Sequence, residues 1–137
     1  MDALSRLEKI GFKRIGKWVQ GSDGLIFVPD GEMPGANVLY AFVSLRAVLY
    51  VGKTARPLAK RLYGYQRPHE SQRTNVACNK EICKQLANNN QIDVFARQEQ
   101  RTAQIGTFTI SEAAALEDAI IRDLQPPWNQ TGRRNST

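Results

Sequence analysis

The heptapeptide at residues 37–43 (NVLYAFV) has an apolar side chain at nearly every position. Successive side chains of a strand point to opposite faces, so a strand that is apolar throughout must be covered by protein on both faces. Residues 48–51 form a second apolar run, and only residues 44–47 separate it from the first. We therefore expect an antiparallel pair of buried strands that other elements enclose.

The rest of the chain mixes helical and extended patterns. Ser111 is expected to cap a helix that ends at Leu124, because Pro126 and Pro127 follow it. The other expected elements are a helix at 2–11, a hairpin with strands at 15–19 and 25–28, a helix after Pro57, a helix capped by Thr74 or Asn75 and ending at Ala87, a third strand at 92–96 and a short strand at 107–109. This mixture predicts one α+β domain, and 137 residues suit a single domain.

Positive charge is concentrated in the middle third of the chain. Residues 52–101 hold ten Lys and Arg against four Asp and Glu, a net +6 that equals the charge of the whole chain. Such a segment favours a polyanionic partner, most simply nucleic acid, with a merely solvated surface as the alternative. No apolar run approaches the length of a membrane-spanning helix, and residues 1–9 lack the apolar stretch of a secretory signal. We expect an intracellular, cytoplasmic protein with no membrane partner.

One carboxylate interrupts the apolar stripe of the helix at 111–124. At 100° per residue Glu117 falls inside a stripe about 160° wide, whereas Asp118 and Arg122 fall on the opposite face. The apolar members of the stripe are Leu116, Ile120, Ala113, Leu124, Ile121 and Ala114. A buried charge is costly unless it is paired, protonated, metal-bound or extended to the stripe's edge. A salt bridge and a divalent cation shared with a substrate phosphate both remain open.

The segment after the second strand carries a complementary set of side chains. Arg61 and Tyr65 are four residues apart, so they share one face of the helix that follows Pro57. Lys53 lies just beyond the strand end, after Gly52, which allows a phosphate to approach the backbone closely. A planar guanidinium suits phosphate oxygens, and a phenol can donate or accept a hydrogen bond. These residues are candidates for phosphate binding, with a surface position as the alternative for Arg61.

Together these residues resemble the GIY-YIG nuclease superfamily over roughly residues 37–130. The motifs that carry the resemblance are Val38-Leu39-Tyr40, Tyr50-Val51-Gly52, Lys53-Thr54, Arg61-Leu62, Leu116-Glu117 and Pro127-Trp128-Asn129. Arg61 stands 11 positions after Tyr50, one more than the family's usual spacing, and Lys60 occupies the strict position. Arg61 is preferred because Leu62 follows it and because Tyr65 then lies four residues later. Lys60 stays open as its rival.

The resemblance implies a small three-stranded antiparallel central sheet flanked by helices. Residues 37–130 would be the nuclease domain, 1–36 a helix and hairpin extension packed on the core, and 131–137 a polar tail. The implied activity is metal-dependent hydrolysis of DNA, in which Glu117 holds Mg²⁺ (or Mn²⁺) at the scissile phosphate. The family's catalytic positions fall on Tyr40, Tyr50, Lys53, Arg61, Tyr65, Glu117 and Asn129. Tyr40 would take the proton of the attacking water, Arg61 would stabilise the phosphate, and Asn129 would maintain the shape of the site.

Double-stranded DNA is the expected partner. The residues expected to contact it are Arg56, Lys60, Arg67, Gln72, Arg73, Asn75, Asn79 and Lys80. The basic members would bind phosphates, whereas Gln72, Asn75 and Asn79 would read base edges or form a solvated loop and helix cap. The short chain resembles the compact restriction endonucleases of the superfamily, and cutting both strands would require a homodimer. A structure-selective nuclease and a non-cleaving DNA-binding module are the competing interpretations.

Overall fold

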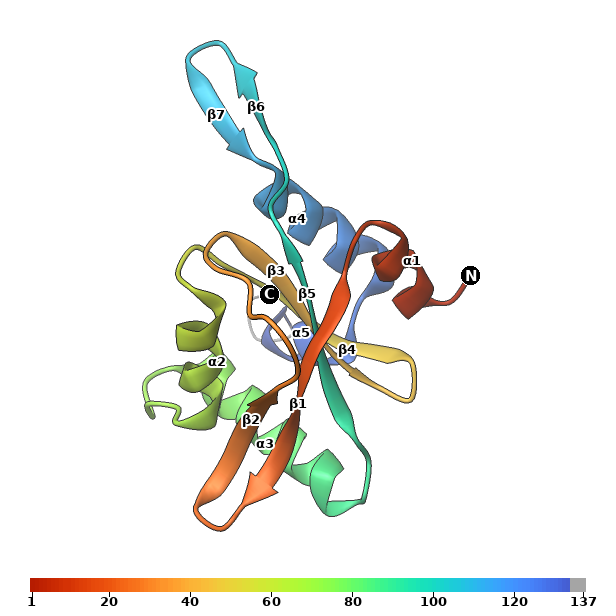
Figure 1. Cartoon of the computed structure of the whole chain (residues 1–137), viewed down its shortest axis with the longest axis vertical. Coiled ribbons are helices and arrows are strands. Elements are labelled where there is room, and N and C mark those ends of the chain that lie inside the picture. Colours follow the sequence, from red (N-terminus) through yellow and green to blue (C-terminus); the bar gives the residue numbers. More distant parts are fainter. Residues whose placement is uncertain (134–137) are drawn as a thin grey trace.

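The computed structural model of the chain describes residues 1–133. Its elements, labelled in Figure 1, are α1 (Ala3–Lys9), β1 (Lys13–Gly21), β2 (Gly24–Pro29), β3 (Val38–Ser44), β4 (Ala47–Thr54), α2 (Leu58–Gln66), α3 (Arg73–Ala87), β5 (Ile92–Gln98), β6 (Thr102–Ile105), β7 (Phe108–Ser111), α4 (Glu112–Leu124) and α5 (Pro127–Arg133). The α+β class is confirmed. Among the described residues no helix has the length and apolar character needed to cross a bilayer.

The central sheet has five strands, so the expectation of three strands was wrong. Their order is β2-β1-β5-β3-β4, and every neighbouring pair is antiparallel. The three expected strands are present as β3, β4 and β5, but β1 pairs along the free side of β5 and brings β2 with it. Trp18 of β1 is 1% exposed and meets Phe42 of β3 edge-on, with ring centroids 5.8 Å apart. The N-terminal hairpin therefore completes the sheet and shares its core.

Helices cover both faces of this sheet, as the apolar run at 37–43 requires. Tyr40 and Phe42 of β3 face one hydrophobic core together with Leu62 of α2 and Ile82 of α3. The alternate residues of β3 face a second core, to which α1 and α4 contribute. This alternation explains why all seven residues of β3 are buried. Helix α5 lies along β4, the outer strand of the sheet, and contacts α3 as well.

The cap of α4 agrees with expectation, whereas the helix that follows it was not predicted. Ser111 caps α4 as predicted, since its hydroxyl accepts a hydrogen bond from the Ala114 N–H at 3.3 Å. Pro127, expected only as a stop, also begins α5, because proline is favoured in the first turn of a helix. Helix α5 includes residues 131–133, the start of the expected polar tail. The rest of that tail, 134–137, lies outside the described residues.

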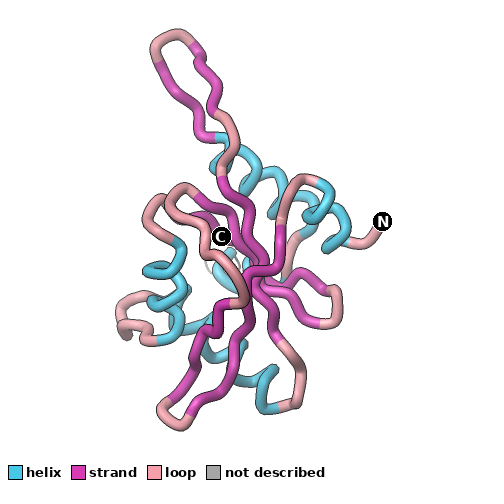
Figure 2. The backbone as a smooth tube through the Cα atoms, in the orientation of Figure 1, coloured by secondary structure: helices cyan, strands magenta, loops and turns pink. Residues whose placement is uncertain are grey.

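Residues 102–111 form a projecting hairpin where the sequence predicted only a short strand at 107–109. Strands β6 and β7 pair antiparallel as a separate two-stranded sheet. In Figures 1 and 2 this hairpin extends away from the rest of the molecule, beyond the start of α4. Gly106 permits the tight turn, because it adopts a φ of 61°. We call residues 102–111 the arm.

Candidate active site

Strands β3 and β4 place two phenols on the same face of the sheet. Tyr50 is the cross-strand partner of Phe42, and Gly52 is the partner of Tyr40. A Cβ atom on Gly52 would lie 2.5 Å from the Cζ and hydroxyl oxygen atoms of Tyr40, so the ring of Tyr40 occupies the space that a side chain would need. The glycine of the second motif therefore makes room for the tyrosine of the first.

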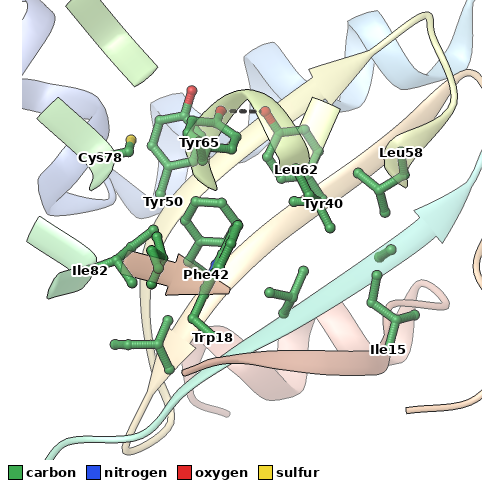
Figure 3. Packing of buried hydrophobic residues seen from close by; sticks show 14 of the residues in the cluster. Ile15, Trp18, Tyr40, Phe42, Tyr50, Leu58, Leu62, Tyr65, Cys78 and Ile82 are labelled. Atoms are coloured by element: carbon green, nitrogen blue, oxygen red, sulfur yellow. Dashed lines mark hydrogen bonds between the residues drawn. The ribbon is translucent and has the colours of Figure 1, made fainter. Parts of the chain in front are cut away.

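Helix α2 adds a third phenol and a guanidinium to this pair. The ring centroids of Tyr40, Tyr50 and Tyr65 lie 6.1–6.3 Å apart, and Figure 3 shows the three rings converging. The hydroxyls of Tyr40 and Tyr65 share a hydrogen bond of 2.5 Å. Arg61 donates to the Tyr65 hydroxyl at 2.7 Å, and its guanidinium carbon lies 4.1 Å from the centre of that ring. We call these four residues the phenol cluster.

The cation of the phenol cluster is Arg61 rather than its rival. Lys60 is exposed, whereas Arg61 is partly buried and hydrogen bonded to a buried phenol. One helical turn separates Arg61 from Tyr65, and Leu58 and Leu62 anchor the same side of α2 in the core.

Two asparagines of α3 fix the phenol cluster from behind. Asn75 is 6% exposed, and its amide oxygen accepts a hydrogen bond from Arg61 at 2.8 Å. Asn79 donates to the backbone carbonyl of Tyr65 at 2.8 Å. Both amides were expected to read DNA bases or to form a solvated loop and helix cap, but α3 begins at Arg73, so both lie inside the helix, and their hydrogen bonds join it to α2. Their spacing with Cys78 and Ile82 is that of one helix face, which was the missed signal.

Burial keeps the phenols protonated in the free protein. Desolvation raises the pKa of Tyr40, and the neighbouring Tyr50 raises it further, while the charge of Arg61 opposes the shift. The pKa of Tyr65 is raised for the same reasons. Desolvation also raises the pKa of Tyr50, with a smaller contribution from the charge of Glu117. A tyrosinate in the cluster is therefore disfavoured until more positive charge is brought near.

Glu117 approaches from the other layer of the fold. It projects from α4, whose apolar residues belong to the second core, and its side chain is half-buried. Desolvation raises the pKa of its carboxyl group, and the charge of Lys53 opposes that shift. Lys53 lies on β4, two residues after Val51 and on the same face of the strand, and its side chain is exposed. The charge of Glu117 also contributes to the raised pKa of Tyr50 on β4, an outer strand of the sheet.

A salt bridge was one expected explanation of Glu117. Among residues 1–130, whose side chains the structure describes, none forms an ion pair or a hydrogen bond with the Glu117 carboxylate, whereas Asp118 pairs with Arg122 at 3.6 Å on the exposed face. The described residues contain no cluster of three or more His, Cys, Asp and Glu side chains that would enclose a metal. Glu117 would therefore be the single protein ligand of a cation, a donor set that suits Mg²⁺ shared with phosphate and water.

Asn129 has a structural role at the edge of the sheet. Its amide oxygen accepts from the Val51 N–H and its amide nitrogen donates to the Val51 carbonyl, each at 2.9 Å. This pair of bonds imitates a neighbouring strand and ties α5 to β4 between Tyr50 and Gly52. It satisfies backbone groups that would otherwise lie unpaired on an outer strand.

The other expected DNA contacts are surface residues. Arg56, Lys60, Arg67, Gln72, Arg73 and Lys80 are all exposed, in or between β4, α2 and α3. Arg67 donates to the Asp23 carbonyl at 3.2 Å, and Gln72 accepts from Asn75 at 3.0 Å. These basic side chains lie on the same segments that build the phenol cluster.

The fold is shared with two solved nucleases. A mutant of bacteriophage T4 EndoII matches with a TM-score of 0.74 and 19% identity, over 93% of this chain and 98% of that one. The restriction endonuclease HPY188I in complex with product DNA matches with a TM-score of 0.56 and 21% identity, over 90% of this chain and 79% of that one. The sequence matches no protein-family model and no curated protein. At these identities the likeness establishes the common fold.

Proposed function

We propose that the chain is a metal-dependent DNA endonuclease with a GIY-YIG-type centre. The observation that carries this proposal is the phenol cluster together with Glu117, a half-buried carboxylate on α4 whose charge acts on Tyr50 and which no described side chain pairs. The motifs of the resemblance supply those residues, and two endonucleases share the fold. One of these is described in complex with product DNA, which supports duplex DNA as the substrate here.

Glu117 is the residue we assign to a divalent cation, Mg²⁺ or Mn²⁺. Its raised pKa reflects a carboxylate that lacks solvation, and a cation would supply the missing charge. A cation bound there would act as a Lewis acid on the scissile phosphate and offset the charge that develops on it. Lys53, whose charge already acts on Glu117, would bind a phosphate oxygen from the exposed side of β4.

The phenol cluster would activate water and hold the phosphate. Tyr40 is the group we assign to the proton of the attacking water, and Arg61 favours that role because its charge opposes the rise that burial causes in the pKa of Tyr40. The hydroxyl group of Tyr65 is hydrogen bonded to both Tyr40 and Arg61 and so connects them. Tyr50 would orient the water or the phosphate by a hydrogen bond. Arg61 would also stabilise the charge of the transition state.

We further propose a compact, site-specific enzyme of the restriction type. The basic side chains of α2, α3 and the loops beside them would bind phosphates, which provides affinity without sequence choice. With Asn75 and Asn79 turned inward, Gln72 remains as the exposed amide in this region that we assign to base reading. Specificity would then come from the nuclease fold itself.

Cleavage of supercoiled plasmid DNA in the presence of Mg²⁺ tests the proposal. The wild-type chain should nick or linearise the plasmid, and chelation of the metal should stop it. Glu117→Gln should abolish cleavage, whereas Asp118→Asn, the neighbouring acid on the exposed face of α4, should cut normally. A wild-type chain that binds duplex DNA but never cuts it would contradict the enzyme and favour the binding module. Cut ends that share one sequence support a site-specific enzyme, and ends gathered at branches or flaps support a structure-selective one.

A further inference from the structure

The arm exposes an entire apolar face. Its strands pair Ile105 with Phe108 and Ala103 with Ile110, so these four side chains share one face of the ribbon. Ile105 is 65% exposed and Phe108 is 75% exposed. The other face is polar, with a hydrogen bond of 2.8 Å from the Gln104 amide to the Thr109 hydroxyl. None of the described residues covers the apolar face, because residues 102–110 are all exposed.

The base of the arm is fixed to the body. Glu99 accepts hydrogen bonds from the Ser111 hydroxyl at 2.6 Å and from the Ala113 N–H at 3.1 Å. Glu112 pairs with the buried guanidinium of Arg97 at 2.7 Å and accepts from the Gln100 N–H at 3.1 Å. The arm therefore leaves β5 and α4 in a set direction, away from the rest of the chain (Figure 1).

An uncovered ribbon of two strands is unstable in water unless a further element packs on its apolar face. The charge distribution indicates what that element is. Residues 102–111 contain no charged side chain in a chain of net charge +6. A surface that binds DNA would carry lysine or arginine for the phosphates, and this one has neither. A neutral apolar face on a long projection instead allows two positively charged copies of the chain to associate. The positive charges of the two copies then remain far enough apart for salt to screen their repulsion.

We propose that the apolar face of the arm is a homodimerisation surface, occupied by the arm of a second copy of this chain. Two arms stacked face to face about a two-fold axis bury Ile105, Phe108 and Ile110 of both copies in a small two-layered sheet. The polar faces remain in water. This inference does not rest on the proposed nuclease function, although a dimer would provide the second site needed to cut both strands.

Sedimentation velocity of the full chain without DNA tests the proposal. The wild type should sediment with twice the 15.4 kDa mass of one chain. The double variant Ile105→Thr/Phe108→Thr should sediment as a monomer, since threonine keeps the propensity for strands but removes the apolar face. The matched control is Ile26→Thr/Val28→Thr on β2, whose side chains are 40% and 38% exposed; it should remain a dimer. Added salt should leave the dimer intact or strengthen it.

Three results would overturn the proposal. The first is a wild-type chain that remains a monomer at every concentration. This result would overturn the proposal even if the arm variant bound DNA more weakly than the wild type. The second is an arm variant that remains a dimer while its thermal unfolding stays cooperative. The third is a β2 control variant that becomes a monomer while the arm variant remains a dimer. The dimer interface would then lie on β2, the outer strand opposite β4.

Discussion

Replacement of Gly52 by alanine is the sharpest test of the way the phenol cluster is packed. The new Cβ atom would lie 2.5 Å from both the Cζ and the hydroxyl oxygen of Tyr40. Tyr40 is 1% exposed, so its ring cannot move outward without displacing Phe42 or Tyr65. Overpacking of this kind costs about 1–3 kcal/mol. Loss of the hydrogen bond between Tyr40 and Tyr65 adds about 0.5–1.5 kcal/mol.

We therefore expect Gly52→Ala to lower the free energy of unfolding by about 1.5–4.5 kcal/mol, which at a slope of about 2 kcal/mol per M moves the urea midpoint down by about 1–2 M. Equilibrium urea denaturation followed by circular dichroism measures this. Gly35→Ala is the matched control, because a Cβ atom there meets nothing within 4 Å, and its stability should stay within about 0.5 kcal/mol of wild type.

A double-mutant cycle with Tyr40→Phe identifies the cause. Removing the hydroxyl relieves one of the two close contacts, so the double variant should lose less stability than the two single variants together. If Gly52→Ala is as stable as Gly35→Ala, or if its effect adds fully to that of Tyr40→Phe, the packing described for this glycine is refuted.

Three further predictions concern the supports of the site. Asn129→Ala should cost about 1–3 kcal/mol in urea denaturation, because two backbone groups of Val51 lose their partners; an unchanged midpoint would contradict this. Asn75→Ala should lower kcat for cleavage while KM changes little, because Arg61 loses the bond that aims it; a pure KM effect would instead indicate a DNA contact. Glu117→Gln should raise the melting temperature at neutral pH without divalent cations, because the folded state carries a desolvated charge. That gain should vanish in acid, where the wild-type carboxyl group is protonated in both states, and a gain that persists there would refute the electrostatic cause.

Local patterns predicted much of the fold but not the way the strands combine. The apolar run at 37–43 predicted a strand enclosed on both faces, and β3 is buried along its whole length. The same kind of pattern could not show that β1 pairs with β5, because pairing partners far apart in sequence leave no periodicity in either segment. The central sheet was therefore underestimated by two strands.

The candidate site shows the same division. The helical stripe at 111–124 identified Glu117 as an unusual carboxylate, since periodicity alone places it among core residues. Spacing also placed Arg61 with Tyr65. Asn75 and Asn79 were expected to read base edges because their side chains are amides. In the structure Asn75 instead accepts a hydrogen bond from Arg61, and Asn79 donates one to the Tyr65 carbonyl. Their hydrogen bonds are tertiary contacts, so only the helical spacing with Cys78 and Ile82 indicated that they face inward.

We propose that Glu117 of α4 and the phenol cluster act on one phosphate. Single-turnover cleavage by Glu117→Gln, Arg61→Met and the double variant tests it most directly. If the two residues form one catalytic unit, the double variant should be no slower than the slower single variant. If the two losses multiply, the carboxylate and the guanidinium act independently, which would contradict a single catalytic unit.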